Sequence, residues 1–348
     1  MHHQSVDRSF NMEFGYWKEN FTEWKMFRDN KITNNDQAHE FFGFDPIKTI
    51  SGKTWMNPVF EEKVIEETED KKILQNIDGL IAEVPKDGHE TIPHYLDAQV
   101  KTPDDWKQVK EKRFRLDDPA RLIDVESLKA DHPAGRDYPV GVWCGSMMGK
   151  IRDMLTFEGI AYAIFDYPEM LEDMVETCCL LVEHSLDQLL PAFDFDFASG
   201  WEDIAYKQGP IVTLDFFEQV VVPRYKRIGK KLSSAGIDIW YTDCDGDVRK
   251  MIPGFLEAGL NTMFPFEVNC SGFVGDTLDE YGPDLRVMGG VDKMILASGR
   301  EAIKAHLEEL VPYVERGGYI PHCDHRCPPN VPEADYLYYL ELKKQMFS

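Results

Sequence analysis

The stretch IDIWYTDCDGDVRKMIPGFLEAGLNTMFPFEV, residues 237–268, decides the fold. Its two ends, 237–246 and 261–268, are short apolar runs of the kind that form strands. Between them, residues 247–259 have the spacing of a helix that buries one face. A strand, a helix and a second strand in this order are the repeating unit of a parallel sheet.

The same alternation covers most of the chain after residue 126. Further apolar runs predict strands at 138–146, 195–203, 285–293 and 317–325. Segments with helical spacing lie at 167–190, 214–234 and 299–315. No Gly-rich dinucleotide fingerprint follows any of these strands, which favours a closed barrel over a doubly wound sheet. We therefore predict an α/β protein whose residues 126–348 form a (β/α)8 TIM barrel.

Residues 1–125 have a different pattern, irregular and rich in aromatic side chains. We predict that they form an N-terminal extension, a helical cap, that packs on the barrel within one structural domain. Two extended runs joined by the turn dipeptide Asp87-Gly88 predict a β-hairpin insertion. Thr102 followed by Pro103 predicts the start of a helix.

Composition excludes several classes of protein. With 43% hydrophobic and 29% charged residues the chain is typical of a globular protein, and no run approaches 18 apolar residues, so we expect no membrane span. A net charge of −24 would repel nucleic acid. The N-terminus lacks a basic segment followed by an apolar run, so we expect a cytoplasmic protein whose seven cysteines are reduced.

Polar side chains gather where the predicted strands end, which in a β/α barrel is where active sites lie. The five ends carry Glu202, Asp203, Tyr206 and Lys207; Asp243, Cys244, Asp245 and Asp247; Glu267 and Cys270; Asp292 and Lys293; and His322, Cys323, Asp324, His325 and Cys327. A structural role stays open for some of them. Glu202 and Asp203 could cap the next helix, and one of Asp245 and Asp247 is expected to do so.

Familiar catalytic motifs are absent from the sequence. There is no G-x-S-x-G elbow and no H-E-x-x-H, and the loop at residues 145–150 is too short for a phosphate-binding Walker motif. Serine hydrolases and P-loop enzymes are therefore not supported.

Several longer runs resemble the uroporphyrinogen decarboxylase superfamily, and more closely its branch of corrinoid-dependent methyltransferases. They are GWEDIAYKQGP (200–210), the opening stretch 237–267, LRVMGGVDK (285–293) and GGYIPHCDHRCPPNVPEADYLYYLELKK (317–344). The runs FGYWKENFTEWK (14–25) and IPHYLDAQVKTPDDWKQVK (92–110) also match that branch, so the resemblance covers nearly the whole chain. It implies a β/α barrel.

The resemblance also implies a site. Zinc in these methyltransferases is held by a His-x-Cys or similar pair, an acidic residue and a Cys near the C-terminus. The matching positions here are Asp243 and Asp245, then Glu267, then Cys323 or His325. The metal set that follows is Asp245, Glu267, Cys323 and His325. Two carboxylates in place of His and Cys make the site harder and more anionic, which suits a substrate oxygen better than a thiol. Either an oxygen-preferring metal or protonated acids without a metal would serve.

The implied activity is removal of a methyl group from a small donor, an aryl methyl ether such as guaiacol, and its transfer to a reduced corrinoid (cobalamin). The nearest string to the corrinoid motif Asp-x-His-x-x-Gly begins with Ala130, so a partner corrinoid protein must supply the cofactor. We assign ether activation to Asp243, Asp245, Glu267 and His325. Substrate binding is assigned to Glu202, Asp203, Tyr206 and Lys207.

Other functions stay open at this point. A methylamine or a methylthiol is an alternative donor. A decarboxylase would need cations for substrate carboxylates, but residues 50–63, where that family carries arginines, have none, and the strand ends offer only Lys207, Lys293 and Arg326. A barrel that only docks the corrinoid protein is a third alternative, and a homodimer is compatible with the sequence.

Overall fold

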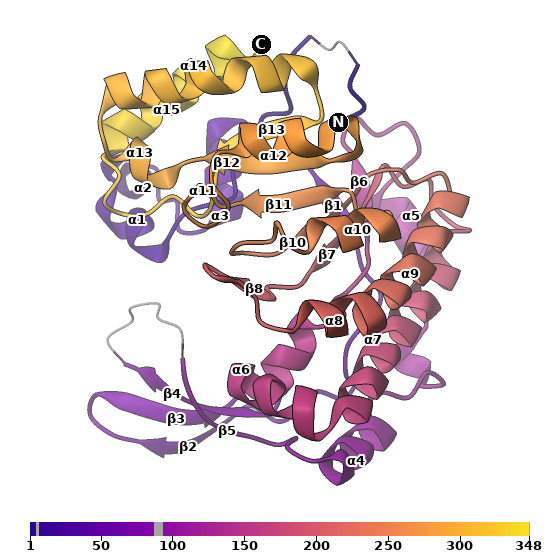
Figure 1. Ribbon diagram of the computed structural model, residues 1–348. Coiled ribbons are helices and arrows are strands. Elements are labelled where there is room, and N and C mark those ends of the chain that lie inside the picture. Colours follow the sequence, from indigo (N-terminus) through magenta and orange to yellow (C-terminus); the bar gives the residue numbers. More distant parts are fainter. Residues whose placement is uncertain (5–6, 87–92, 348) are drawn as a thin grey trace.

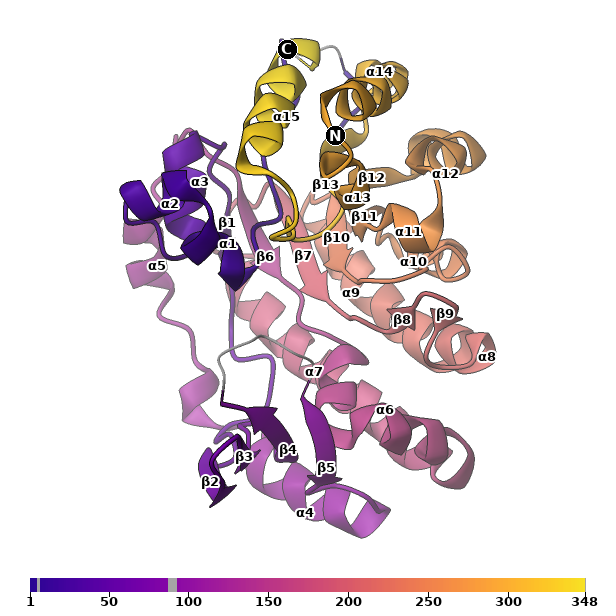
Figure 2. The same cartoon turned by 90° about the vertical axis from the view of Figure 1, so that its left-hand side faces the viewer.

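The computed structural model describes residues 1–4, 7–86 and 93–347. Its centre is a parallel sheet with the strand order β1-β6-β7-β10-β11-β12-β13, seen from two sides in Figures 1 and 2. The strands of this sheet are β1 Lys48–Ile50, β6 Val140–Trp143, β7 Phe197–Trp201, β10 Trp240–Asp243, β11 Thr262–Phe266, β12 Arg286–Val291 and β13 Tyr319–Cys323. All six strands predicted from apolar runs are confirmed.

Helices connect these strands and cover the outside of the sheet (Figure 2). They are α6 Gly149–Asp166, α7 Pro168–Leu189, α8 Leu214–Phe216, the π-helical η2 Phe217–Val221, α9 Val222–Ser234, α10 Ile252–Ala258, α11 Val268–Ser271, α12 Val274–Tyr281, the 3-10 helix η3 Gly282–Asp284, α13 Lys293–Leu296, α14 Arg300–Arg316 and α15 Glu333–Met346. The helical segments predicted at 167–190, 214–234, 247–259 and 299–315 all contain helices. The amphipathic α7, for example, buries Leu171, Val175, Cys178 and Val182 along one face.

The predicted (β/α)8 barrel is confirmed in part. The structure contains the predicted parallel sheet with helices around it, but a closed ring of eight strands is not seen among the described residues. Within the described residues, seven strands pair in this sheet, and no ladder joins its edge strands β1 and β13. Near that opening the N-terminal segment makes a single bridge, between Tyr16 and Cys327. Two backbone hydrogen bonds flank it, from Cys327 N–H to Gly15 O (2.8 Å) and from Trp17 N–H to Cys327 O (3.3 Å).

The residues that precede β6 are partly helical. Their helices are α1 Lys18–Glu23, α2 Lys25–Asp29, α3 Asn35–Phe42, α4 Pro103–Arg113, the 3-10 helix η1 Pro119–Arg121 and α5 Val125–Asp131, of which α5 runs past the predicted boundary at residue 125. Thr102 caps α4 as predicted, in a capping box with Asp105. The strand β1 lies within residues 1–125 but pairs with β6, so the main sheet takes its first strand from this extension.

A separate antiparallel sheet has the order β2-β3-β4-β5, with β2 Lys63–Glu67, β3 Lys71–Gln75, β4 Leu80–Pro85 and β5 His94–Ala98. The predicted hairpin corresponds to β4 and β5, which pair with each other. The first of its two predicted runs, residues 73–84, is not one extended run, because it contains the end of β3, a turn and β4, which pair as a second hairpin. Its turn, Asp87-Gly88, lies outside the described residues. Figure 1 shows this small sheet beside α6, at the end of the molecule opposite α14 and α15.

The described helices include none that is long and apolar enough to cross a membrane. All seven cysteines are free. Aromatic residues of the cap pack mainly on one another and on α15, because Tyr16, Trp24 and Phe42 all contact the buried Tyr336 ring. These rings belong to the hydrophobic core.

Candidate functional site

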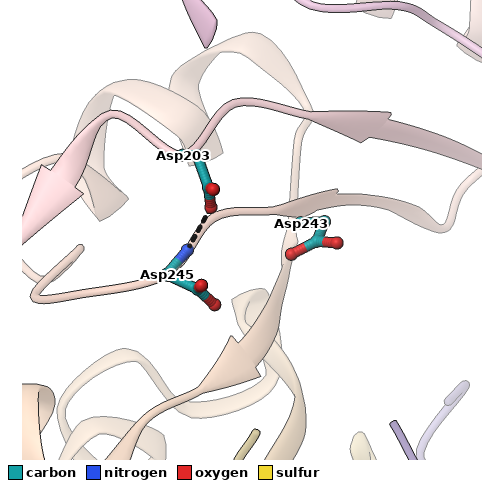
Figure 3. A group of neighbouring side chains, drawn as sticks. All are labelled: Asp203, Asp243 and Asp245. Carbon is teal, nitrogen blue, oxygen red and sulfur yellow. Dashed lines mark hydrogen bonds between the residues drawn. The ribbon is translucent and has the colours of Figure 1, made fainter. Parts of the chain in front are cut away.

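Three carboxylates meet beyond the carboxyl ends of β7 and β10 (Figure 3). Asp203 follows β7 by two residues, Asp243 is the last residue of β10, and Asp245 follows it by two. One carboxylate oxygen from each lies within 4.8 Å of the others. Because β7 and β10 are parallel neighbours, with Asp243 opposite Trp201, the segments that follow them emerge side by side. We call Asp203, Asp243 and Asp245 the carboxylate triad.

Backbone geometry fixes two members of the triad. The Asp245 N–H donates to Asp203 Oδ1 at 3.0 Å, the bond drawn in Figure 3. Asp203 has a φ of 50°, a left-handed conformation that is uncommon for a residue other than glycine. Gly246 also has a positive φ, and a Cβ there would lie 2.6 Å from the Ala205 carbonyl oxygen. The turn after β10 can therefore approach the chain after β7 only with glycine at this position.

Burial and crowding raise the pKa values of two members of the triad, Asp243 and Asp203. The pKa of Asp243 is raised to about 8, first by burial and then by the charges of Asp245 and Asp203, while the Arg326 guanidinium acts in the opposite direction. The pKa of Asp203 is raised to about 6, again by burial first and by Asp245 second. Near neutral pH the triad thus retains a proton, which a carboxyl group in water would have lost.

His325 joins the triad from beyond β13. Its Nε2 atom lies 3.3 Å from Asp245 Oδ2, and its ring lies 5.2 Å from the Phe14 ring. Phe14 in turn contacts Phe264 of β11, at 5.1 Å between ring centroids. The predicted convergence of Asp243, Asp245 and His325 is therefore seen in the structure. The other oxygen of Asp245, Oδ1, is buried and has no hydrogen-bond partner within the described residues.

Glu267 lies close to this group but is held by other partners. It accepts hydrogen bonds from Lys293 Nζ (2.8 Å) and from the Gly246 N–H (2.9 Å). Behind it, the fully buried Asp324 accepts from the N–H groups of Val268 (2.9 Å) and Lys293 (3.0 Å). The ion pair of Glu267 with Lys293 is thus joined to the Asp245-Gly246 turn through the Gly246 N–H.

Glu202 does not face a substrate. It is 1% exposed, and its carboxylate accepts from three consecutive N–H groups at the start of α6 and from two hydroxyls. The donors are Met147 N (2.6 Å), Met148 N (2.8 Å), Gly149 N (2.9 Å), Ser146 Oγ (3.3 Å) and Tyr225 OH. The predicted substrate-binding role is therefore replaced by a structural one, because adjacent residues at a strand end point to different sides.

The four predicted metal ligands are not brought together. Cys323 is 1% exposed, and its thiol pKa is raised well above its usual value by burial and by neighbouring groups, Cys327 first among them. Glu267 is bonded to Lys293, as described above. Among the described residues, the carboxylate triad is the only group of three or more His, Cys, Asp or Glu side chains within reach of one ion. Its ligands are all oxygens, so these residues do not fit a thiolate zinc site.

The remaining predicted binding residues lie at the rim. Tyr206 is 46% exposed and contacts Phe157, and Lys207 is exposed. They belong to a small antiparallel ribbon or its turn, formed by β8 Ala205–Tyr206 and β9 Gly209–Pro210. Neither is part of the triad, although both lie within four residues of Asp203.

Arg152 was not predicted from the sequence. Its guanidinium donates to the Asp203 carbonyl oxygen at 2.6 Å, lies 3.7 Å from Asp203 Oδ2, and sits over the Trp201 ring at 5.2 Å. It holds the unusual backbone of Asp203 from the side of α6. No pattern in the sequence marks Arg152, because it lies in the first turn of α6 and not at the end of β6.

Comparisons with known proteins establish the fold. The sequence matches no protein-family model, and no curated protein matches it. The structure is similar to that of a methyltransferase from Methanosarcina mazei, with a TM-score of 0.58 over 99% of this chain and 96% of that chain. At 13% sequence identity, this likeness shows a shared fold.

Proposed function

We propose that this chain is a methyltransferase that removes the methyl group from a small aryl methyl ether of the guaiacol type and passes it to the reduced corrinoid of a partner protein. The resemblance of the sequence to the corrinoid-dependent branch supports this, as does the fold shared with the Methanosarcina mazei methyltransferase. The observation that carries the proposal is the carboxylate triad, in which Asp245 and Asp203 crowd Asp243. Burial and this crowding raise the pKa of Asp243 to about 8, so that it can donate a proton near neutral pH.

The reaction needs an acid because of its leaving group. The bond between the ether oxygen and the methyl carbon breaks, its electron pair stays on the oxygen, and the partner's corrinoid supplies the electron pair for the new bond to carbon. An alkoxide or phenolate would leave poorly without a proton. Asp243 gives its proton to this oxygen, so that a neutral phenol departs.

The surroundings of Asp243 support the role of an acid. Burial and two negative neighbours raise its pKa to about 8, so its protonated form is favoured at pH 7. Asp245 is oriented by His325 and by its own N–H bond to Asp203. Its buried Oδ1, which lacks a partner within the described residues, is placed to accept a hydrogen bond from a second hydroxyl of the substrate.

Aromatic contacts suit the ring of such a substrate. Phe14 packs between Phe264 and His325, and Trp201 lies at the end of β7 under Arg152. Of the aromatic residues in the N-terminal cap, Phe14 is thus the one assigned to the substrate. Tyr206 and Lys207 at the rim are assigned to substrate entry and weaker contacts.

The test measures demethylation directly. The purified chain is incubated with guaiacol, a methylamine or a methylthiol, and with free cob(I)alamin or a panel of reduced corrinoid carrier proteins as acceptor. We expect catechol from guaiacol together with methylation of an acceptor. Turnover of only the amine or the thiol would overturn the ether assignment, and the absence of methyl transfer from every donor to every acceptor would overturn the function.

A further inference from the structure

The second half of α6 exposes aromatic side chains. Phe157 is 44% exposed, Tyr162 63% and Phe165 77%. Phe157, Ala161 and Phe165 follow one another at intervals of four residues, so they lie on one face of the helix, and Tyr162 lies beside them. We call Phe157, Tyr162 and Phe165, together with Ala161 between them, the aromatic stripe. Rings this exposed are costly in water, and a contiguous set of them marks a binding surface more often than chance.

A break in α6 sets this segment apart. Thr156 has a φ of 69° inside the helix, a conformation that a β-branched residue rarely adopts. Its hydroxyl accepts the Gly159 N–H at 3.2 Å, as the N-cap of a new helix would. Residues 157–166 therefore form a second helical segment with its own start. Backbone outliers of this kind persist where the surrounding structure holds them, often at functional sites.

The stripe is continuous with the candidate active site. The Phe157 ring meets the Tyr206 ring edge to face, at 5.2 Å between centroids. Tyr206 is three residues beyond Asp203, and its carbonyl oxygen accepts the Asp247 N–H at 2.9 Å, which ties it to the turn that carries Asp245. Figures 1 and 2 show α6 directly below β8. A protein seated on the stripe would therefore stand at the rim of the site.

Charge identifies the kind of partner. The sequence contains no Lys or Arg from residue 153 to residue 206. Glu158 and Asp166 border the stripe and are exposed, and neither forms an ion pair with another described residue. A second copy of the chain, meeting this face symmetrically, would bring its own Glu158 and Asp166 against the same acidic border. A basic surface with an apolar centre is the complementary partner.

We propose that the aromatic stripe, with Glu158 and Asp166 at its border, is the docking surface for a protein whose contact face is apolar and rimmed by Lys and Arg. The inference rests on the proposed function, in which that protein is the corrinoid carrier. The methyl group passes directly between substrate and corrinoid, so the carrier must bind next to the triad, and the stripe is an exposed apolar surface that reaches the rim of the triad through Tyr206.

The experiment compares two acceptors. Methyl transfer from guaiacol is measured with free cob(I)alamin and with each carrier protein of the panel, and carrier binding is measured by fluorescence anisotropy. The variants are Phe165→Ser, Tyr162→Ser and the charge reversal Asp166→Lys. Leu122→Ser is the matched control, because Leu122 is 72% exposed but lies before α5, away from the stripe. All four positions are exposed, so folding should be preserved, and thermal melting verifies it.

We expect Phe165→Ser and Asp166→Lys to raise the Kd for the carrier at least about tenfold, as loss of an interface hot spot does. Transfer to free cob(I)alamin should stay within about twofold of the parent, and Leu122→Ser should change neither quantity. Affinity for the carrier should also fall as salt is raised.

Three results would overturn the inference. One is equal carrier binding by the parent and the Phe165→Ser variant. Another is a failure of every carrier in the panel to bind the parent chain, in which case transfer to free cob(I)alamin would still leave the proposed function standing. The last is a dimer of the parent in sedimentation that dissociates in the Phe165→Ser variant, which would reassign the stripe to self-association.

Discussion

Two neighbouring carboxylates, Glu202 and Asp203, lie in regions of opposite character. Around Glu202, at the start of α6, five hydrogen-bond donors surround one buried carboxylate. Around Asp203, in the triad, three carboxylates face one another, with the Asp245 N–H, the His325 ring and the Arg152 guanidinium beside them. The residues are adjacent in the chain, so sequence position alone does not separate the two regions.

The difference teaches that the neighbours of a carboxylate decide what it does. Burial raises the pKa of both Glu202 and Asp243, but hydrogen-bond donors oppose the rise at Glu202, whereas the charges of Asp245 and Asp203 add to it at Asp243. A carboxylate that receives a hydrogen bond at each lone pair is fixed in place and holds elements together. Carboxylates crowded together with few donors repel one another and retain a proton, which makes them available for acid–base chemistry. Glu202 therefore joins β7, α6 and α9, while the triad is the centre of the proposed chemistry.

The largest expected effect is on turnover. Asp243→Asn removes the proton donor with almost no change of shape, so kcat for ether demethylation should fall about 100- to 10,000-fold. KM should change little. Asp238→Asn is the matched control, because Asp238 lies before the same strand and its carboxylate contacts the exposed His2. A near-normal kcat in the Asp243→Asn variant would show that the triad does not supply the proton, and the functional difference between the two regions would be lost.

The next effect is on stability. Glu202→Ala leaves the N–H groups of Met147, Met148 and Gly149 without an acceptor, so the free energy of unfolding should fall by about 2–4 kcal/mol in urea denaturation. Glu218→Ala, at an exposed position of η2, should change it by less than about 0.5 kcal/mol. If Glu202→Ala folded as stably as the parent but raised KM, Glu202 would be a substrate ligand after all.

A smaller effect on stability is expected at the triad, where Asp243→Asn should raise the free energy of unfolding and not lower it. The folded pKa of Asp243 lies above its unfolded value near 3.9, so the folded state binds the extra proton between about pH 4 and pH 8 and loses stability as pH rises through that window. Asp243→Asn removes this cost. It should raise the free energy of unfolding by about 1–3 kcal/mol at pH 8.5 and leave it unchanged near pH 4. Lower stability of the variant at pH 8.5 would show that Asp243 is well paired.

The smallest effect concerns His325, which contacts the triad from one side. Loss of its bond to Asp245 in His325→Ala should lower kcat about three- to tenfold, because the acid itself remains. A loss as large as that of Asp243→Asn would make the imidazole the proton donor instead. Steady-state rates with guaiacol and a saturating acceptor measure both variants side by side.

The hydrophobic pattern of the sequence predicted six strands of the main sheet but neither its short edge strand β1 nor the strand β2 of the separate antiparallel sheet. The six strands found from apolar runs are buried, and burial leaves a clear signature in the sequence. The three residues of β1 are too few to show a pattern, and β2 is exposed at every position and rich in charge, so neither could be recognised. The eighth strand of a closed barrel was inferred from the fold class, and the described residues do not contain it.

For the site, the sequence located the strand ends but not the direction of each side chain. Asp243, Asp245 and His325 were predicted together and lie together. Glu202 and Cys323 were misplaced, since the donors at the start of α6 hold Glu202 in the interior and β13 is buried at every position, Cys323 included. Arg152 could be found only from the structure, because its position depends on where the first turn of α6 lies.

The pH dependence of kcat tests the central claim most directly. If Asp243 delivers its proton to the leaving oxygen, kcat must be high while Asp243 is protonated and must fall as pH rises through about 8. The measurement is kcat for guaiacol demethylation from pH 5.5 to pH 10 with free cob(I)alamin as acceptor, in the parent and in Asp243→Asn. We predict a tenfold fall per pH unit above about pH 8 in the parent and no such limb in the variant. A parent rate that stays level or rises up to pH 10 would contradict the account.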